Sequence, residues 1–403
     1  MANKKLHSPW TIGQAVFLVL FAVLLVFAGV KFWQNPNQNP FVQVLPISQG
    51  SQISVDQFSK GLEKKDFILI NVHTPYEGEI VKTDLFIDFD KIEQRQGELP
   101  KDKTSKIILY CKSGKMSGQA AKKLQELGYS NVSSLAGGMD AWQKADHGIF
   151  NIAELQKAVL PDDGITAPVK WGNLGPTLVS LGVIDLEKFK KGLNPSEAEL
   201  AILTKDVQEP IKIDQNNGQF VVDVLWAFGL AQKSKVYTLG PLGQAYKSQV
   251  GNFASTGGWT LGKNKATSYL GKYDLIKLTN DQQDKVYQVA QNVYRPCCGN
   301  PASFPDCNHG MAALGLIELM VSEGFPEDEI YKTVLGFNSF WFQQNYLTAA
   351  ASFALDGVPW EKVDAKKALS QEYSSGQGAA RLTQKIGPLP YLYGPKSGGG
   401  CGI

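Results

Sequence analysis

The chain has 403 residues, of which 43% are hydrophobic, and its 40 basic residues nearly balance its 38 acidic ones. That length exceeds what one hydrophobic core usually serves, so we expect two or three globular domains. The formal net charge of +2 leaves no broad basic surface, and we therefore expect no nucleic-acid partner. Five cysteines are too few for a disulfide scaffold in a chain of this length.

Residues 1–33 contain an apolar run, 12–30, that is just long enough to cross a bilayer as a helix. Lys4 and Lys5 precede this run, and the lysine bias predicts a cytoplasmic N-terminus with the remaining chain exported. We therefore expect a single-pass membrane anchor whose domains lie outside the cytoplasm. Two alternatives stay open: a signal peptide cleaved near Ala28, which would give a secreted protein, or a buried helix of a soluble domain.

Residues 34–51 are rich in proline, asparagine and glutamine, which is typical of an extended linker. Over residues 52–150, strand and helix signals alternate. The runs FILINV and IILYC are short and apolar, as in buried strands, and the spacing of apolar residues over 117–127 predicts a helix. This alternation predicts an α/β domain with a parallel sheet.

Cys111 ends the second of these strands, and the loop KSGKMS separates it from the helix. Such a loop can direct backbone N–H groups toward the sulfur, and the helix N-terminus adds partial positive charge. Both effects lower a thiol pKa and favour a thiolate or a persulfide anion. We therefore predict Cys111 as a nucleophile, although a buried, inert cysteine is the alternative. The predicted substrate-binding residues are the loop itself, in which two lysines would attract an anionic donor: Lys112, Ser113, Gly114, Lys115, Met116 and Ser117.

Two motifs point to a known family. The segment CKSGKMS resembles the active loop of the rhodanese family, and LGYSNVSSLAGGMDAW resembles that family's closing signature. The resemblance implies a rhodanese fold over about one quarter of the chain. It also implies sulfurtransferase activity, in which Cys111 takes sulfane sulfur from thiosulfate or a persulfide and passes it to a thiol acceptor. No cofactor is required for that reaction.

The opening segment ILINVHTPYEGEI departs from the family pattern, which usually reads Asp-Val-Arg followed by Glu and Gly-His-Ile. Asn71, His73 and Glu79 stand at the Asp, Arg and His positions. We predict auxiliary roles near the loop for His73, as a base or pH-sensitive group, and for Glu77. Met116 occupies a place where the family often has an arginine.

The departures leave other functions open. A tyrosine phosphatase would need an arginine six positions after its cysteine, and Ser117 stands there, so phosphatase chemistry is disfavoured. Reduction of arsenate or another oxyanion is a more distant alternative. A second hypothesis is a non-enzymatic, membrane-held metal-binding or redox-sensor protein that uses the rhodanese-like domain as a docking or thiol-relay module.

Residues 151–395 change to helical patterns separated by glycine and proline, and we expect a mainly α domain that resembles no characterised family. Helices are predicted over 196–203, 220–232, 282–293 and 309–323. The run FNSFWFQQNYLTAAASFAL, residues 337–355, predicts one further core helix. Its aromatic face is expected to serve packing rather than ligand binding and comprises Phe337, Phe340, Trp341 and Tyr346.

The segment RPCCGNPASFPDCNHGM carries the chemical signal of this domain. Three thiols and an imidazole, from Cys297, Cys298, Cys307 and His309, predict a soft metal site for Zn, Cu(I) or an iron–sulfur centre. Cys401, in the glycine-rich tail 396–403, is a candidate additional ligand, although that tail is expected to be disordered. The alternatives are inert burial or a disulfide from Cys307 to Cys297 or Cys298, which an oxidising compartment would favour.

Overall fold

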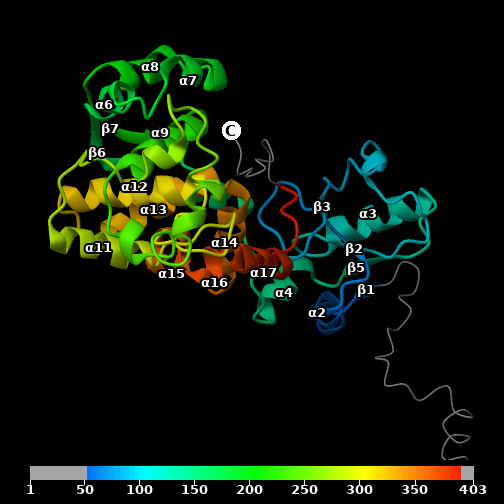
Figure 1. Cartoon of the computed structure of the whole chain (residues 1–403). Coiled ribbons are helices and arrows are strands. Elements are labelled where there is room, and N and C mark those ends of the chain that lie inside the picture. The colour runs from blue at the N-terminus through cyan, green and yellow to red at the C-terminus, as the bar shows by residue number, and fades with distance from the viewer. Residues whose placement is uncertain (1–51, 392–403) are drawn as a thin grey trace, which may run out of the picture. The chain divides into compact units, whose positions relative to one another are not determined.

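The computed structural model describes residues 52–391. The predicted membrane segment, the linker 34–51 and Cys401 lie outside this range. Across 52–391, no helix combines the length and the apolar character that a membrane crossing needs. The described residues form an α/β region followed by a mainly helical one, as predicted from the sequence (Figure 1).

A five-stranded sheet forms the centre of the α/β region, and every strand pair in it is parallel. The strand order is β1-β5-β4-β2-β3. The strands are β1 (Gln52–Ile53), β2 (Ile68–Asn71), β3 (Leu85–Phe86), β4 (Ile107–Tyr110) and β5 (Val132–Leu135). All four residues of β4 are buried, because this central strand has a neighbour on each side and apolar side chains on both faces. The predicted α/β fold with a parallel sheet is confirmed.

Three α-helices accompany this sheet: α2 (Val55–Glu63), α3 (Lys115–Glu126) and α4 (Gly138–Lys144), with a short 3-10 turn, η1 (Gln96–Glu98). Helix α3 buries Ala120, Ala121 and Leu124 against the domain core, at the spacing of one helical face. It contacts β4 and β5. The predicted helix is therefore present, but it begins two residues earlier than expected.

The remainder is mainly helical and contains one antiparallel strand pair, β6 with β7, that the sequence patterns did not predict. Its elements in chain order are α5 (Ile152–Val159), β6 (Ile165–Gly172), α6 (Leu174–Ser180), α7 (Leu186–Leu193), α8 (Glu197–Thr204), β7 (Val207–Ile213), α9 (Gly218–Ala231), α10 (Val236–Leu239), η2 (Lys247–Asn252), η3 (Ala266–Ser268), α11 (Asn280–Ala290), α12 (Asn308–Ser322), α13 (Glu327–Trp341), α14 (Gln343–Leu355), η4 (Trp360–Lys362), α15 (Ala365–Ala368), α16 (Gln371–Ser374) and α17 (Gly376–Ile386).

Helices α9 and α12 form the centre of this region and are buried almost all round. They approach closely because glycines face each other across the contact. A Cβ at Gly229 would lie 2.4 Å from the carbonyl oxygen of Met311, and a Cβ at Gly315 would lie 2.8 Å from that of Leu225. This packing fixes the start of α12, which carries the thiol cluster described below.

The prediction of one helix over 337–355 is wrong. The helix breaks at Phe342, which has φ −133° and ψ 52° and separates α13 from α14. No proline causes the break. The Phe342 ring is buried with its centroid 4.5 Å from that of His309, so tertiary packing overrides the local helical preference. The predicted packing role of the aromatic residues is confirmed, since Phe337, Phe340, Trp341 and Tyr346 are all buried.

Candidate active site and thiol cluster

Cys111 lies immediately beyond the C-terminal end of β4 and is 1% exposed. Its Sγ accepts hydrogen bonds from the backbone N–H groups of Gly114, at 3.1 Å, and Ser117, at 3.4 Å. The Ser117 hydroxyl lies 3.6 Å from the same sulfur. These two backbone donors lie at the start of α3, where N–H groups carry partial positive charge.

Two glycines with positive φ build this loop. Gly114, at φ 89°, is the N-cap of α3 and turns the chain so that its own N–H points at the sulfur. Gly138, at φ 57°, opens α4, and a Cβ there would lie 2.1 Å from the carbonyl oxygen of Cys111. The Met139 N–H donates to that same carbonyl at 2.9 Å. The backbone at the start of α4 therefore packs directly against the Cys111 carbonyl, and Gly138 has no side chain that would prevent this contact.

The six predicted substrate-binding residues all lie around this loop or the first turn of α3. Lys112, Ser113 and Lys115 are exposed, whereas Ser117 is buried beneath the sulfur. The Met116 side chain packs partly against the hydrophobic core of the domain. A guanidinium is therefore absent from the place where the family often has one, and cationic groups near the loop come from lysines.

The predicted auxiliary residues lie together beside the loop. Lys112 Nζ lies 2.6 Å from Glu77 Oε2, and His73 Nε2 lies 3.5 Å from the same oxygen. The hydrogen bond from Lys112 is the main cause of a lowered pKa at Glu77, followed by smaller effects of His73. His73 is buried, whereas Glu77 and Lys112 are exposed. Glu77 therefore partly neutralises the lysine predicted to attract an anionic donor.

The departures from the family pattern have structural roles. The Asn71 amide donates to the carbonyl of Gly78 at 2.9 Å and accepts from the His73 N–H at 3.0 Å, a pair of bonds that an ionised aspartate could not make. Glu79 is fully buried, and its backbone forms an antiparallel bridge with Phe150. Burial raises the pKa of Glu79 to about 8. The sequence marked Glu79 only as a departure and gave no signal of this perturbed carboxyl.

This geometry agrees with the comparisons to known proteins. Residues 54–145 match the family model of the rhodanese-like domain. A sulfurtransferase of Allochromatium vinosum is 33% identical over 106 residues, which are 26% of this chain and 95% of that protein. The chain belongs to the rhodanese-like family. The match ends before the helical region, which it leaves unassigned.

Two further comparisons each cover a quarter of this chain or less. The thiosulfate sulfurtransferase PspE of Escherichia coli is 33% identical over 71 residues, covering 18% of this chain and 68% of that protein. The crystal structure of a rhodanese-related protein from Thermoplasma volcanium is 19% identical, covers 25% of this chain and 97% of that one, and has a TM-score of 0.22.

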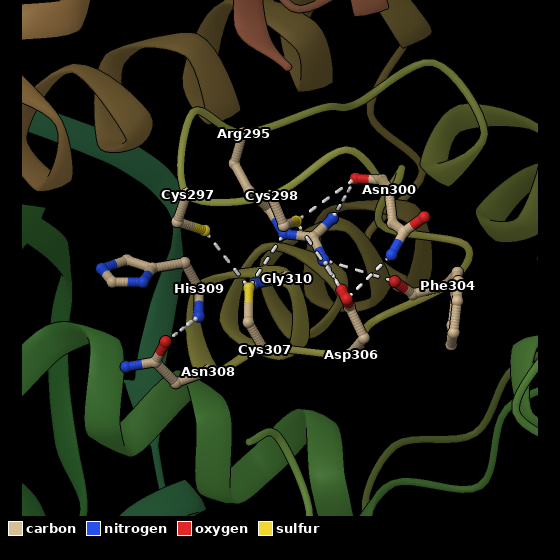
Figure 2. Close-up of polar contacts among 10 residues, drawn as sticks. All are labelled: Arg295, Cys297, Cys298, Asn300, Phe304, Asp306, Cys307, Asn308, His309 and Gly310. Atoms are coloured by element: carbon tan, nitrogen blue, oxygen red, sulfur yellow. Dashed lines mark hydrogen bonds and ion pairs between the residues drawn. The ribbon is translucent and has the colours of Figure 1, made fainter. Parts of the chain in front are cut away.

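The second group of cysteines lies in the helical region (Figure 2). The sulfurs of Cys297, Cys298 and Cys307 lie within 4.8 Å of one another, and those of Cys297 and Cys307 are 3.4 Å apart. Cys307 is buried, while Cys297 and Cys298 are half-buried. The structure therefore brings together three of the four residues predicted as metal ligands in this segment.

His309, the fourth predicted ligand, lies outside that group of mutually close ligand atoms. Its imidazole packs against aromatic rings, with centroids 4.5 Å from Phe342 and 5.8 Å from Trp341. Burial lowers the pKa of His309 to about 4, so the ring is neutral near physiological pH. The imidazole therefore packs against aromatic rings apart from the three sulfurs, and its buried Nδ1 has no hydrogen-bond partner.

Arg295 is the residue of this site that the sequence did not reveal. Its side chain is fully buried, and its guanidinium donates to Cys307 Sγ at 3.1 Å and to Asp306 Oδ1 at 2.6 Å. It also donates to the carbonyl oxygens of Asn300 and Phe304 (Figure 2). The buried guanidinium thus connects four residues of this loop by hydrogen bonds. The only sequence signal for this role was a basic residue next to the cysteine pair.

Cys307 is also the N-cap of α12, and its sulfur accepts from the Gly310 N–H at 3.4 Å. Hydrogen bonds from Cys297 and Cys298, with a smaller contribution from Arg295, hold the pKa of Cys307 well below its usual range. Gly310 is required here, because a Cβ would lie 2.3 Å from the guanidinium carbon of Arg295. Of the three cysteines, Cys307 is therefore the one whose surroundings most favour a thiolate.

Proposed function

We propose that this chain is a sulfurtransferase that carries sulfane sulfur as a persulfide on Cys111. The observation that carries the proposal is the pair of backbone N–H donors, from Gly114 and Ser117, that point at Cys111 Sγ. The relatives named as sulfurtransferases support the same reaction class. The donor and the acceptor are part of this proposal.

In the proposed reaction the Cys111 thiolate attacks the outer, sulfane sulfur of thiosulfate. A new S–S bond forms, the S–S bond of thiosulfate breaks, and sulfite leaves with the bonding electron pair. The loop N–H groups stabilise the sulfur anion before attack and the persulfide anion afterwards. An acceptor thiolate then attacks the terminal sulfur of the persulfide and releases Cys111 as thiolate, so the two transfers balance without a cofactor.

The choice of donor depends on the charges around the loop. Met116 supplies no guanidinium, and the Lys112 ammonium is paired with Glu77 at 2.6 Å. A dianionic donor is therefore held less firmly than it would be by a bidentate arginine. These same observations favour a second candidate function. In it the rhodanese-like domain is a thiol-relay module, which passes sulfur or a disulfide bond between thiols and has little activity with thiosulfate.

A single-turnover experiment tests the proposal. Reduced protein mixed with excess thiosulfate, without a thiol acceptor, should release one sulfite per chain in a rapid phase. Cys111→Ser should release none, while Cys298→Ser, a matched cysteine substitution in the helical region, should behave as the parent protein does. An equal burst from Cys111→Ser would refute the proposed role of Cys111.

Membrane anchoring is a further part of the proposed function. The apolar run 12–30 after Lys4 and Lys5 supports a helix that holds the domains outside the cytoplasm. Protease added to intact spheroplasts should then remove both domains. Domains that stay protected until the membrane is opened would contradict this orientation.

A further inference from the structure

We propose that Cys297, Cys298 and Cys307 form a three-thiolate site for a soft monovalent metal ion, Cu(I), separate from the sulfur-carrying cysteine. The sulfur spacing suits this ion. Three thiolates in a plane, each about 2.3 Å from a central metal, lie about 4 Å apart. The sulfurs of this cluster have similar spacing, because one pair is 3.4 Å apart and all three lie within 4.8 Å of one another.

Within residues 52–391 three sulfurs gather without a fourth ligand, and this number favours Cu(I) over Zn. Structural zinc sites almost always have four protein ligands, whereas Cu(I), which soft thiolates also bind, accepts three. Among the described residues, His309 is not part of the group. The Asp306 carboxylate accepts hydrogen bonds from Arg295 and Asn300, at 2.6 and 2.8 Å, so it is already engaged.

Two N–H donors hold the sulfur of Cys307 in place before a metal binds. Cys307 Sγ accepts hydrogen bonds from the Arg295 side chain, at 3.1 Å, and from the Gly310 backbone N–H, at 3.4 Å, and such outer contacts fix the orientation of a ligating group. The guanidinium charge is matched by Asp306 at 2.6 Å, so it does not cancel the charge of the thiolate cluster. Thiolates that form when the cation binds are therefore not offset by an unpaired guanidinium.

The loop that carries the other two thiols is fixed by its backbone. The Cys298 N–H donates to the Arg295 carbonyl at 3.3 Å, and the Cys298 carbonyl accepts from Gly376, which opens α17, at 2.7 Å. Pro296 further restricts the backbone between Arg295 and Cys297. Because Cys297 and Cys298 are half-buried, a small ion can reach sulfurs that are otherwise held in place.

A disulfide between Cys297 and Cys307 is the competing outcome, since their sulfurs are already 3.4 Å apart. The two chemistries exclude each other, because a disulfide sulfur is no longer a thiolate ligand. Metal binding should therefore protect these thiols from oxidation and alkylation, and the protection can be mapped peptide by peptide.

The test is a Cu(I) titration of the reduced full-length protein under anaerobic conditions, with a chromophoric Cu(I) chelator as competitor. We expect one Cu(I) per chain, an ultraviolet thiolate-to-copper band, and no displacement by a tenfold excess of Zn(II). Cys297→Ser, Cys298→Ser and Cys307→Ser should each weaken binding at least about a hundredfold, because a hard hydroxyl replaces a soft ligand. Cys307→Ser keeps a helix N-cap, so its fold is expected to survive.

Matched variants separate this site from the others. Cys111→Ser, Cys401→Ser and His309→Phe should bind Cu(I) as the parent protein does. Any of the following would overturn the proposal: less than a tenth of an equivalent bound after full reduction, full affinity retained by Cys307→Ser, displacement by Zn(II), or loss of binding in His309→Phe. The sulfite burst of the parent protein should be the same with and without Cu(I) at this site, so failure here and failure of the sulfurtransferase proposal are distinguishable.

Discussion

Cys111 lies in the loop before α3 and Cys307 is the N-cap of α12, and both sulfurs accept backbone N–H groups from the start of a helix. They differ in what surrounds them. Around Cys111 the loop presents exposed lysines, whereas Cys307 is flanked by a buried guanidinium and two more thiols. Backbone donors at a helix start are therefore common to both sulfurs, and we expect the neighbouring groups to decide between transferring sulfur and holding a ligand.

The largest expected effect separates the two sites by function. Cys111→Ser should lower thiosulfate turnover by at least about a thousandfold, because a hydroxyl is a far weaker nucleophile than a thiolate. Its free energy of unfolding should change by less than about 1 kcal/mol, since the loop bonds to the backbone remain. Cys307→Ser should leave turnover unchanged. Steady-state kinetics of both variants checks this prediction. An equal loss of turnover in both variants would show that the two sites do not act separately.

Removal of the guanidinium should break the second site without touching the first. Arg295→Met removes the guanidinium from Asp306 Oδ1 and from two carbonyls, so we expect a loss of about 3 to 5 kcal/mol in the free energy of unfolding. Urea denaturation measures it. Lys235→Met is the control, because its exposed ion pair with Asp284 should contribute less than about 1 kcal/mol. An equally small change in the free energy of unfolding of both variants would show that the contacts of Arg295 do not stabilise the loop.

The pH dependence of stability sharpens the comparison in the rhodanese-like domain. Burial raises the pKa of Glu79 from 4.5 to about 8, so the folded state binds a proton that the unfolded state releases between these values. The contribution of Glu79 to stability is therefore fullest below about pH 4.5 and falls as pH rises toward 8. Glu79→Gln should flatten this decline by a few kcal/mol at most.

Urea midpoints from pH 5 to 8 check the Glu79 prediction. Asp223, in α9, has a pKa raised by burial to about 7 and should leave a residual decline of the same sign. Asp223→Asn is thus the matched control, and it should remove its own part of the residual decline, while Glu318, whose pKa burial also raises, keeps the rest. An unchanged slope in Glu79→Gln would show that this carboxyl is not buried as described.

The smallest effect concerns the donor. Met116→Arg should lower the KM for thiosulfate severalfold, up to about tenfold, because a guanidinium can hold an oxyanion by two hydrogen bonds. Met116→Leu, which keeps the apolar packing of this partly buried side chain, should not change KM. An unchanged KM in Met116→Arg would indicate that the natural donor is not this anion, and would favour the thiol-relay alternative.

The sequence allowed the Cys111 loop to be predicted because its parts are local: an apolar strand, a glycine and a helix start follow one another in the chain. The cysteine cluster was also predictable by proximity in the sequence. The burial of Arg295 was not, since its partners become visible only when the loop folds over α12. In the same way, the break at Phe342 and the pairing of β6 with β7 depend on tertiary contacts that periodicity does not report.

Peptide mass mapping after thiosulfate treatment tests the central claim most directly. Reduced protein is treated with thiosulfate, trapped with an alkylating reagent and digested, and the added mass is assigned among the five cysteines. The account predicts one extra sulfur atom on the peptide that contains Cys111, and none on the peptides of Cys297, Cys298 and Cys307. Extra sulfur on Cys307, with Cys111 unmodified, would contradict it.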